Sequence, residues 1–92
     1  MKESKKKDIN GNSSRKNYQL ILLNDDENTF DDVIESLMHI CGHNLYQAEQ
    51  CALIVNNNGE VVIYNGNKKT TEQMYRLLID DGLFVKIQKK PE

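Results

Sequence analysis

The sequence predicts a single α+β domain, a two-layer sandwich in which three helices cover a three-stranded antiparallel or mixed sheet in the order βααβαβ. Two features lead to this prediction. Short apolar runs bounded by Asn, Asp and Gly are typical of strands, and they alternate with longer segments whose apolar residues recur at helical spacing. A chain of 92 residues has room for one hydrophobic core, so a second domain is not expected.

Three segments have the composition of strands. The run YQLILL at 18–23 is too short for a helix, and EVVIY at 60–64 is β-branched and bounded by turn residues. In LFVKIQKK, at 83–90, apolar and polar residues alternate, which indicates a strand with one face in the core. Such strands bury their apolar faces when the helices cover one side of the sheet.

Three further segments have helical spacing, and each follows a capping residue whose partner lies three positions later. Glycine, the usual residue at a helix stop, ends each segment. The expected caps and stops are Thr29 with Asp32 and Gly42, Asn44 with Gln47 and Gly59, and Thr70 with Gln73 and Gly82. The residues expected to face the core are Phe30, Val33, Ile34, Leu37, Met38 and Cys41 in the first helix, Leu45, Ala48, Cys51, Ala52 and Val55 in the second, and Met74, Leu77 and Leu78 in the third.

Charge divides the chain near residue 17. Residues 1–17 contain six Lys or Arg and two Asp or Glu, a net charge of +4, and since the whole chain carries −2, the remainder carries −6. The first 17 residues are too polar to form a core, so we expect a disordered arm followed by a folded domain at 18–90. An acidic domain binds nucleic acid poorly, and no apolar run is long enough to cross a membrane. A cytoplasmic protein with neither partner is therefore expected.

The sequence offers little for catalysis. It contains no glycine-rich phosphate loop, no GxSxG motif and no Cys pair at zinc-binding spacing. His39 and His43 flank the predicted end of the first helix, where a structural role is the better interpretation. We interpret Cys41 and Cys51 as buried thiols in a reducing compartment, because they lie in predicted helices. No catalytic residue, metal or cofactor is expected.

The stretch LNDDENTFDDVIE contains six carboxylates and no Lys or Arg. Asp31 and Asp32 fall in the first turn of a predicted helix, where the helix dipole favours negative charge. Capping explains Asn24, Asp25 and Asp26 less well, because three polar residues are not needed to end one strand. A metal-dependent hydrolase site is one alternative use of these carboxylates.

The block YQLILLNDDENTFDDVIESL resembles the opening of the ClpS family, adaptors for ATP-dependent Clp proteolysis, in which a Tyr-led strand runs into Asn-Asp-Asp and then a helix. The similarity continues through AEQCALIVNNNGEV and more weakly to LLIDDGLFVKI, so it covers about residues 18–88. It implies a monomeric, non-catalytic adaptor that binds the N-terminal residue of a substrate protein, an N-degron. The adaptor would then deliver its substrate to the N-terminal domain of a hexameric Clp AAA+ unfoldase.

The resemblance also implies how the substrate's free α-amino group is held. In the family the Asn-Asp-Asp turn binds it, which corresponds here to Asn24, Asp25 and Asp26. An α-amine with a pKa of about 7.7 to 8.0 is largely an ammonium group at neutral pH, and amide and carboxylate oxygens accept its hydrogen bonds. The family's third acceptor is a His, but the matching residue here is Asn56. Asn56 either accepts from the amine in the same way or only opens the helix stop NNNG.

The resemblance assigns a pocket for the substrate's first side chain. At two of its positions the family commonly has Met, whereas this chain has the larger Phe30 and the smaller Ala52, so the accepted residues are expected to differ from the family's large hydrophobic set. Helical spacing alone would place most of these residues in the core. Asn28 either shapes the pocket mouth or caps the helix. The implied pocket residues are Asn28, Phe30, Val33, Ala52, Val55 and Leu83.

Two functions remain open at this stage. The first is an adaptor that grips N-terminal residues. The second is a domain of the same fold that docks on the unfoldase and modulates substrate choice without binding N-terminal residues.

Overall fold

The structure, a computed structural model, describes residues 16–91 of the chain. The expected arm, residues 1–17, therefore falls almost entirely outside the described residues. The elements follow the predicted order: β1 (Tyr18–Leu23), α1 (Phe30–Cys41), α2 (Leu45–Asn58), β2 (Glu60–Gly66), α3 (Lys68–Asp80) and β3 (Val85–Lys89).

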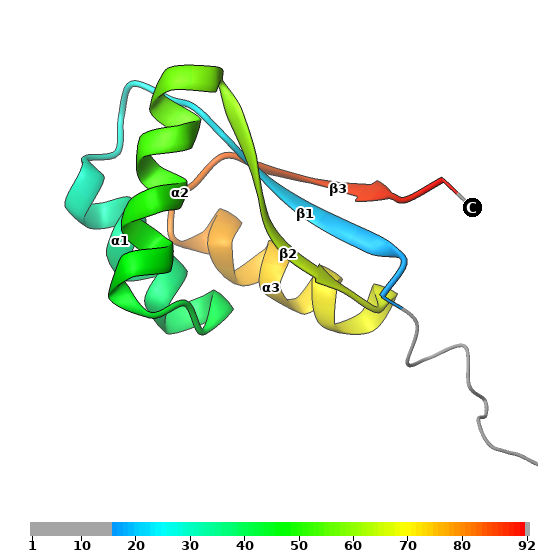
Figure 1. The fold of residues 1–92 in the computed structure, drawn as a ribbon. Coiled ribbons are helices and arrows are strands. Elements are labelled where there is room, and N and C mark those ends of the chain that lie inside the picture. Colours follow the sequence, from blue (N-terminus) through cyan, green and yellow to red (C-terminus); the bar gives the residue numbers. More distant parts are fainter. Residues whose placement is uncertain (1–15, 92) are drawn as a thin grey trace, which may run out of the picture.

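The three strands form an antiparallel sheet in the order β2-β1-β3, so the earliest strand lies in the middle. Figure 1 shows α3 running along the sheet, with α1 and α2 gathered at the end where β1 finishes and β2 begins. The fold is the predicted α+β two-layer sandwich, with the antiparallel arrangement. The chain thus brings the end of β1, the start of α1 and the end of α2 to one end of the molecule.

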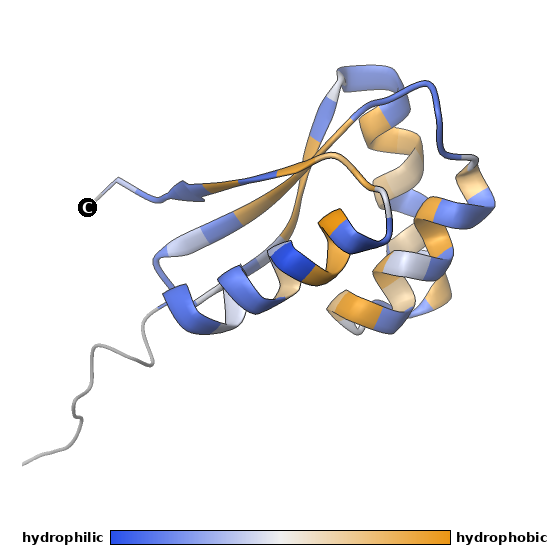
Figure 2. Cartoon of the chain, turned by 180° about the vertical axis from the view of Figure 1, so that it is seen from behind, coloured by the Kyte–Doolittle hydropathy of each residue, from blue (hydrophilic) through white to orange (hydrophobic). Residues whose placement is uncertain are grey.

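The core lies between the sheet and the helices. Leu20, Ile21 and Leu22 are all buried, as expected of a central strand, and Leu37 and Leu78 bring α1 and α3 against it. Figure 2 shows hydrophobic residues along the strands and on the helices, and hydrophilic residues along the loop that follows β1. That loop is the polar segment LNDDENT of the sequence, and it borders the site described below.

A β-bulge in β2 explains the structural role of His43. The pairing register of β1 with β2 shifts between Leu20 and Ile21, which leaves Ile63 without a partner in the ladder. The His43 ring donates from Nε2 to the Ile63 carbonyl oxygen at 2.8 Å, and so satisfies a backbone group that the bulge would leave unpaired. His43 therefore has the structural role expected from the sequence.

The capping pairs predicted for α1 and α2 are confirmed, but the third is wrong. Thr29 with Asp32 and Asn44 with Gln47 form reciprocal boxes. α3 begins earlier than expected, because the Asn67 side chain accepts a hydrogen bond from the Thr70 backbone at 2.8 Å and caps the helix.

Several residues expected in the core are exposed instead. Leu45 and Leu77 lie on the outer sides of their helices, although helical spacing places them next to buried neighbours. Met38 and Phe30 are also exposed, and Phe30 borders the recess described below. The buried stripe of each helix is therefore narrower than the apolar spacing indicates, because the helices contact the small sheet over only part of their circumference.

The two cysteines are half-buried. Burial, together with the nearby Cys51, raises the pKa of Cys41 to about 11, and burial also raises the pKa of Cys51. Both thiols are therefore protonated at neutral pH and poorly nucleophilic.

Candidate functional site

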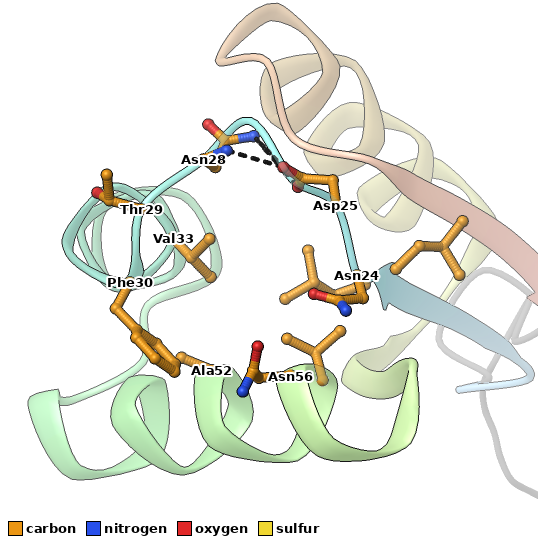
Figure 3. Close-up of a pocket in the computed structure, with 11 residues that line it drawn as sticks. Asn24, Asp25, Asn28, Thr29, Phe30, Val33, Ala52 and Asn56 are labelled. Carbon is orange, nitrogen blue, oxygen red and sulfur yellow. Dashed lines mark hydrogen bonds between the residues drawn. The ribbon is translucent and has the colours of Figure 1, made fainter.

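A recess of about 70 Å³ lies where β1 ends, between the first turn of α1 and the second half of α2 (Figure 3). Its floor is apolar and buried, whereas its rim is mostly polar. The floor consists of Leu22, Val33, Ala52 and Val55, and the rim of Leu23, Asn24, Asp25, Asn28, Thr29, Phe30 and Asn56.

The loop 24–29, which forms one side of the recess, is anchored to the rest of the fold by hydrogen bonds. Its base is fixed by the Leu23 amide, which donates to the Phe84 carbonyl at 2.8 Å. Farther along, the Asn28 side chain donates from Nδ2 to the Gly82 carbonyl at 2.9 Å. Because these contacts join the loop to the chain around the start of β3, the rim is held in place without any ligand.

Asp25 organises this loop from within. Its carboxylate oxygen Oδ1 accepts from the backbone amides of Glu27 at 2.7 Å and Asn28 at 2.8 Å, and Oδ2 accepts from the Asn28 side chain at 3.2 Å (Figure 3). Partial burial alone would raise the pKa of Asp25, but these hydrogen bonds outweigh it and lower the pKa below its usual value of 3.8. Asp25 is therefore a carboxylate at neutral pH and places a negative charge on the rim.

Gly59 joins the end of α2 to the same loop. Its φ of 92° is left-handed, a conformation that glycine adopts without strain, and its amide donates to the Val55 carbonyl to end the helix. The Gly59 carbonyl then accepts from the Asn24 amide at 2.9 Å. This contact holds the backbone of Asn24 beside the end of α2, whose last turn contains Asn56.

The amide groups of Asn24 and Asn56 are directed toward the hollow (Figure 3). Both residues are exposed, and neither side chain makes a hydrogen bond to another residue within 16–91. Two amide oxygens are thus free to accept hydrogen bonds from a ligand.

The surroundings of the recess favour positive charge. The chain has no Lys or Arg between Lys16 and Lys68, and the recess adjoins the negatively charged Asp25. Asn56 stands at the C-terminal end of α2, the negative end of that helix dipole. An apolar floor beneath such a rim suits a ligand that carries an ammonium group beside an apolar group.

Most of the residues expected at the site are brought together, and two are not. Asp26 is exposed and does not border the recess, and Leu83 is buried in the core and borders a separate depression beside Phe84. Thr29, and not Asn28, caps α1, whereas Asn28 borders the recess. Of the two roles expected for Asn28, the structure therefore agrees with the one at the mouth of the pocket. The expected residues that border the recess are Asn24, Asp25, Asn28, Phe30, Val33, Ala52, Val55 and Asn56.

Three residues that border the recess were not expected from the sequence. Leu22 and Leu23 end the strand directly before Asn24, and Thr29 is the helix cap. Their adjacency to the polar turn is the signal that could have identified them.

Within residues 16–91, no three His, Cys, Asp or Glu side chains are grouped so that they could hold a metal ion. None of the helices in this part of the chain is both long and apolar enough to cross a membrane.

The fold and the recess together define a small α+β binding domain with a site suited to a cationic, partly apolar ligand. The model of the family "ATP-dependent Clp protease adaptor protein ClpS" matches residues 13–83. The chain therefore belongs to the ClpS family.

Known relatives agree with this assignment. The ClpS adapter proteins of Campylobacter jejuni strain 81-176 and of C. jejuni subsp. doylei are each 51% identical over 47 residues, which is 51% of this chain and 49% of each relative. The matched region thus spans about half the length of these relatives. A solved structure of Agrobacterium tumefaciens ClpS2 bound to L-phenylalaninamide superposes with a TM-score of 0.77 over 83% of this chain and 100% of that chain. At 18% identity, that similarity establishes the fold alone.

Proposed function

We propose that this protein is a non-catalytic adaptor that binds the N-terminal residue of substrate proteins and delivers them to a Clp AAA+ unfoldase for degradation. The observation that carries the proposal is the pair of amide groups of Asn24 and Asn56, which make no hydrogen bond within the described residues and face a hollow with an apolar floor beside the carboxylate of Asp25. A protein N-terminus has the matching chemistry, because its ammonium group stands one carbon away from its first side chain.

In the proposed complex the α-ammonium group lies between Asn24 and Asn56 and donates hydrogen bonds to their amide oxygens. Asp25 contributes its charge, while its oxygens continue to hold the loop. The first side chain of the substrate enters the apolar floor. Asp26, which is exposed outside the recess, acts only through its charge in this arrangement.

The relatives support the same chemistry. The Campylobacter proteins are named as adapters of the Clp protease. The Agrobacterium relative is bound to L-phenylalaninamide, a molecule that has a free α-amine next to an apolar side chain. Docking on the N-terminal domain of a hexameric unfoldase, a monomeric state and a cytoplasmic location belong to this proposal as well.

Amine dependence is the property that tests the proposal. Fluorescence anisotropy would compare two labelled peptides that begin with Leu and differ only in whether the α-amine is free or acetylated. Acetylation removes both the charge and two of the three donors, so we expect affinity to fall roughly tenfold or more. Binding that ignores acetylation contradicts the proposal. If no peptide binds at all, the alternative of a domain that docks on the unfoldase without gripping N-terminal residues is favoured.

Delivery is tested separately from binding. Deletion of residues 1–16 leaves the recess intact, so we expect unchanged peptide affinity and slower degradation of a Leu-initiated substrate by the unfoldase and its peptidase. Loss of peptide affinity upon this deletion would contradict the separation of the two roles.

A further inference from the structure

The aromatic ring of Phe30 occupies part of the recess mouth. Phe30 is the first residue of α1 and is 46% exposed, although the helical spacing of the sequence places it with core residues. Figure 3 shows its ring directed toward α2, on the side of the recess where Ala52 lies. A large side chain on α1 therefore faces a small one on α2.

The space that remains is small. The recess measures about 70 Å³, roughly half of the 150 Å³ cavity that holds a benzene ring in an engineered protein. The enclosed part of the recess is therefore smaller than the space a phenyl ring fills, and the four-carbon side chain of Leu is the closer match in size.

The floor of the recess has little freedom to enlarge. Leu22, Val33 and Val55 are all buried members of the hydrophobic core, and close-packed core residues resist displacement. The polar side of the recess is fixed by the contacts of the loop 24–29 with Gly59 and Gly82. Of the apolar walls, Phe30 alone is substantially exposed.

Phe30 itself adapts poorly. A phenylalanine side chain has two rotatable bonds and a rigid, planar ring. It does not reshape around a ligand as an unbranched, flexible side chain does. The volume left by its ring thus limits what enters.

We propose that the recess selects Leu over the aromatic residues Phe, Tyr and Trp as the first residue of a substrate, and that Phe30 is the residue that sets this limit. The inference rests on the proposed function and deepens it by naming the substrate class. Phe30 acts by excluding volume, since an aromatic first residue either displaces the ring or leaves its own ring in water.

The test is a titration with four peptides that differ only in their first residue, Leu, Phe, Tyr or Trp, each with a free and an acetylated amine. We expect the free Leu peptide to bind roughly tenfold or more tightly than each aromatic peptide, the scale on which hydrophobic pockets discriminate size. In Phe30→Ala the recess is larger, so we expect the preference for Leu to disappear or to reverse.

Phe84→Ala is the matched control, because Phe84 is also 45% exposed but borders the separate depression near Leu83. We expect it to keep the preference for Leu. Thermal melting of each variant verifies folding, and Phe30→Leu provides a second, milder enlargement, for which an intermediate preference is expected.

The outcomes separate this inference from the proposed function. If aromatic peptides bind as tightly as the Leu peptide and all need a free amine, the proposed selectivity is wrong while the adaptor function stands. If the preference for Leu survives in folded Phe30→Ala, Phe30 is not the limiting residue. If no peptide binds in an amine-dependent way, the proposed function itself fails, and the selectivity fails with it.

Discussion

Two hollows on this domain differ in size and in chemistry, and the smaller one is the better candidate site. The recess measures about 70 Å³, whereas an open groove between the α1–α2 turn and β2 measures about 570 Å³. The groove is lined by Cys41, Gly42, His43, Tyr46, Gln47, Gln50, Cys51, Val62, Ile63, Tyr64 and Asn65.

Two of the polar side chains that line the groove, His43 and Gln47, serve the fold itself. His43 donates to the Ile63 carbonyl, and its other ring nitrogen, which has no partner within residues 16–91, is shielded from solvent. Gln47 is bonded to Asn44 in the capping box of α2. In the recess, by contrast, the side chains of Asn24 and Asn56 make no hydrogen bond within residues 16–91 and converge on one hollow. A functional site is therefore better identified from unused polar groups that converge on an apolar floor than from the volume of a hollow.

The largest expected effect on binding is that of Asn24→Ala. Loss of a hydrogen bond to a charged group costs about 2 kcal/mol, so the affinity for a Leu-initiated peptide should fall roughly 30-fold in an anisotropy titration. Asn65→Ala, which removes an exposed asparagine side chain from the groove, is the control and should change affinity less than about twofold. Equal effects of the two substitutions would remove the distinction between recess and groove.

Val55→Ala should destabilise the domain by about 2 kcal/mol in urea unfolding, because Val55 is a buried part of the recess floor. The same substitution in the groove, Val62→Ala, should cost less than about 1 kcal/mol, since Val62 is 39% exposed. Similar costs at both positions would show that the recess floor is not part of the core.

Binding should weaken as pH rises. The site favours the charged amine, so binding raises the pKa of the peptide's amine, and affinity is complete below the free pKa of about 7.7 to 8.0 and is lost above it. Between pH 7 and pH 9 the affinity should fall roughly tenfold, because the ammonium fraction of the free peptide falls by about that factor. Asp25, whose pKa is lowered from 3.8, remains charged throughout this range. Affinity that is constant from pH 7 to pH 9 would contradict capture of an ammonium group.

The smallest expected effect is that of Asn56→Ala, about 1 kcal/mol or roughly fivefold in affinity, because Asn56 is exposed at the rim, where water competes for its hydrogen bond. Asn57→Ala is the matched control, since Asn57 is also exposed near the end of α2 but does not border the recess. Asn56→His should retain binding, because a neutral imidazole nitrogen also accepts a hydrogen bond. If Asn56→Ala and Asn57→Ala behave alike, Asn56 serves only in the helix stop.

The element order of the fold could be predicted from local signals, because capping residues and turn residues act within a few positions of one another. The start of α3 shows where such signals fail. Thr70 and Gln73 match a capping box, but Asn67 provides a competing cap three residues earlier, and spacing alone does not decide between them.

The site could be predicted only in part, because the direction of a side chain depends on tertiary contacts. Asp25 and Asp26 are adjacent in the sequence, yet Asp25 turns into its own loop and Asp26 turns outward. The resemblance assigns Leu83 to the pocket, but Leu83 packs in the core. Phe30 has the spacing of a core residue, and only its position opposite Ala52 shows that it narrows a recess.

The most direct measurement is a nitrogen-edited NMR titration of the protein with a short Leu-initiated peptide that has a free amine. We expect the side-chain amide signals of Asn24 and Asn56 and the backbone signal of Asp25 to shift upon saturation, while the signals of Tyr46 and Tyr64 in the groove do not. Shifts confined to the groove, or shifts at the recess that are equally large with the acetylated peptide, would contradict it.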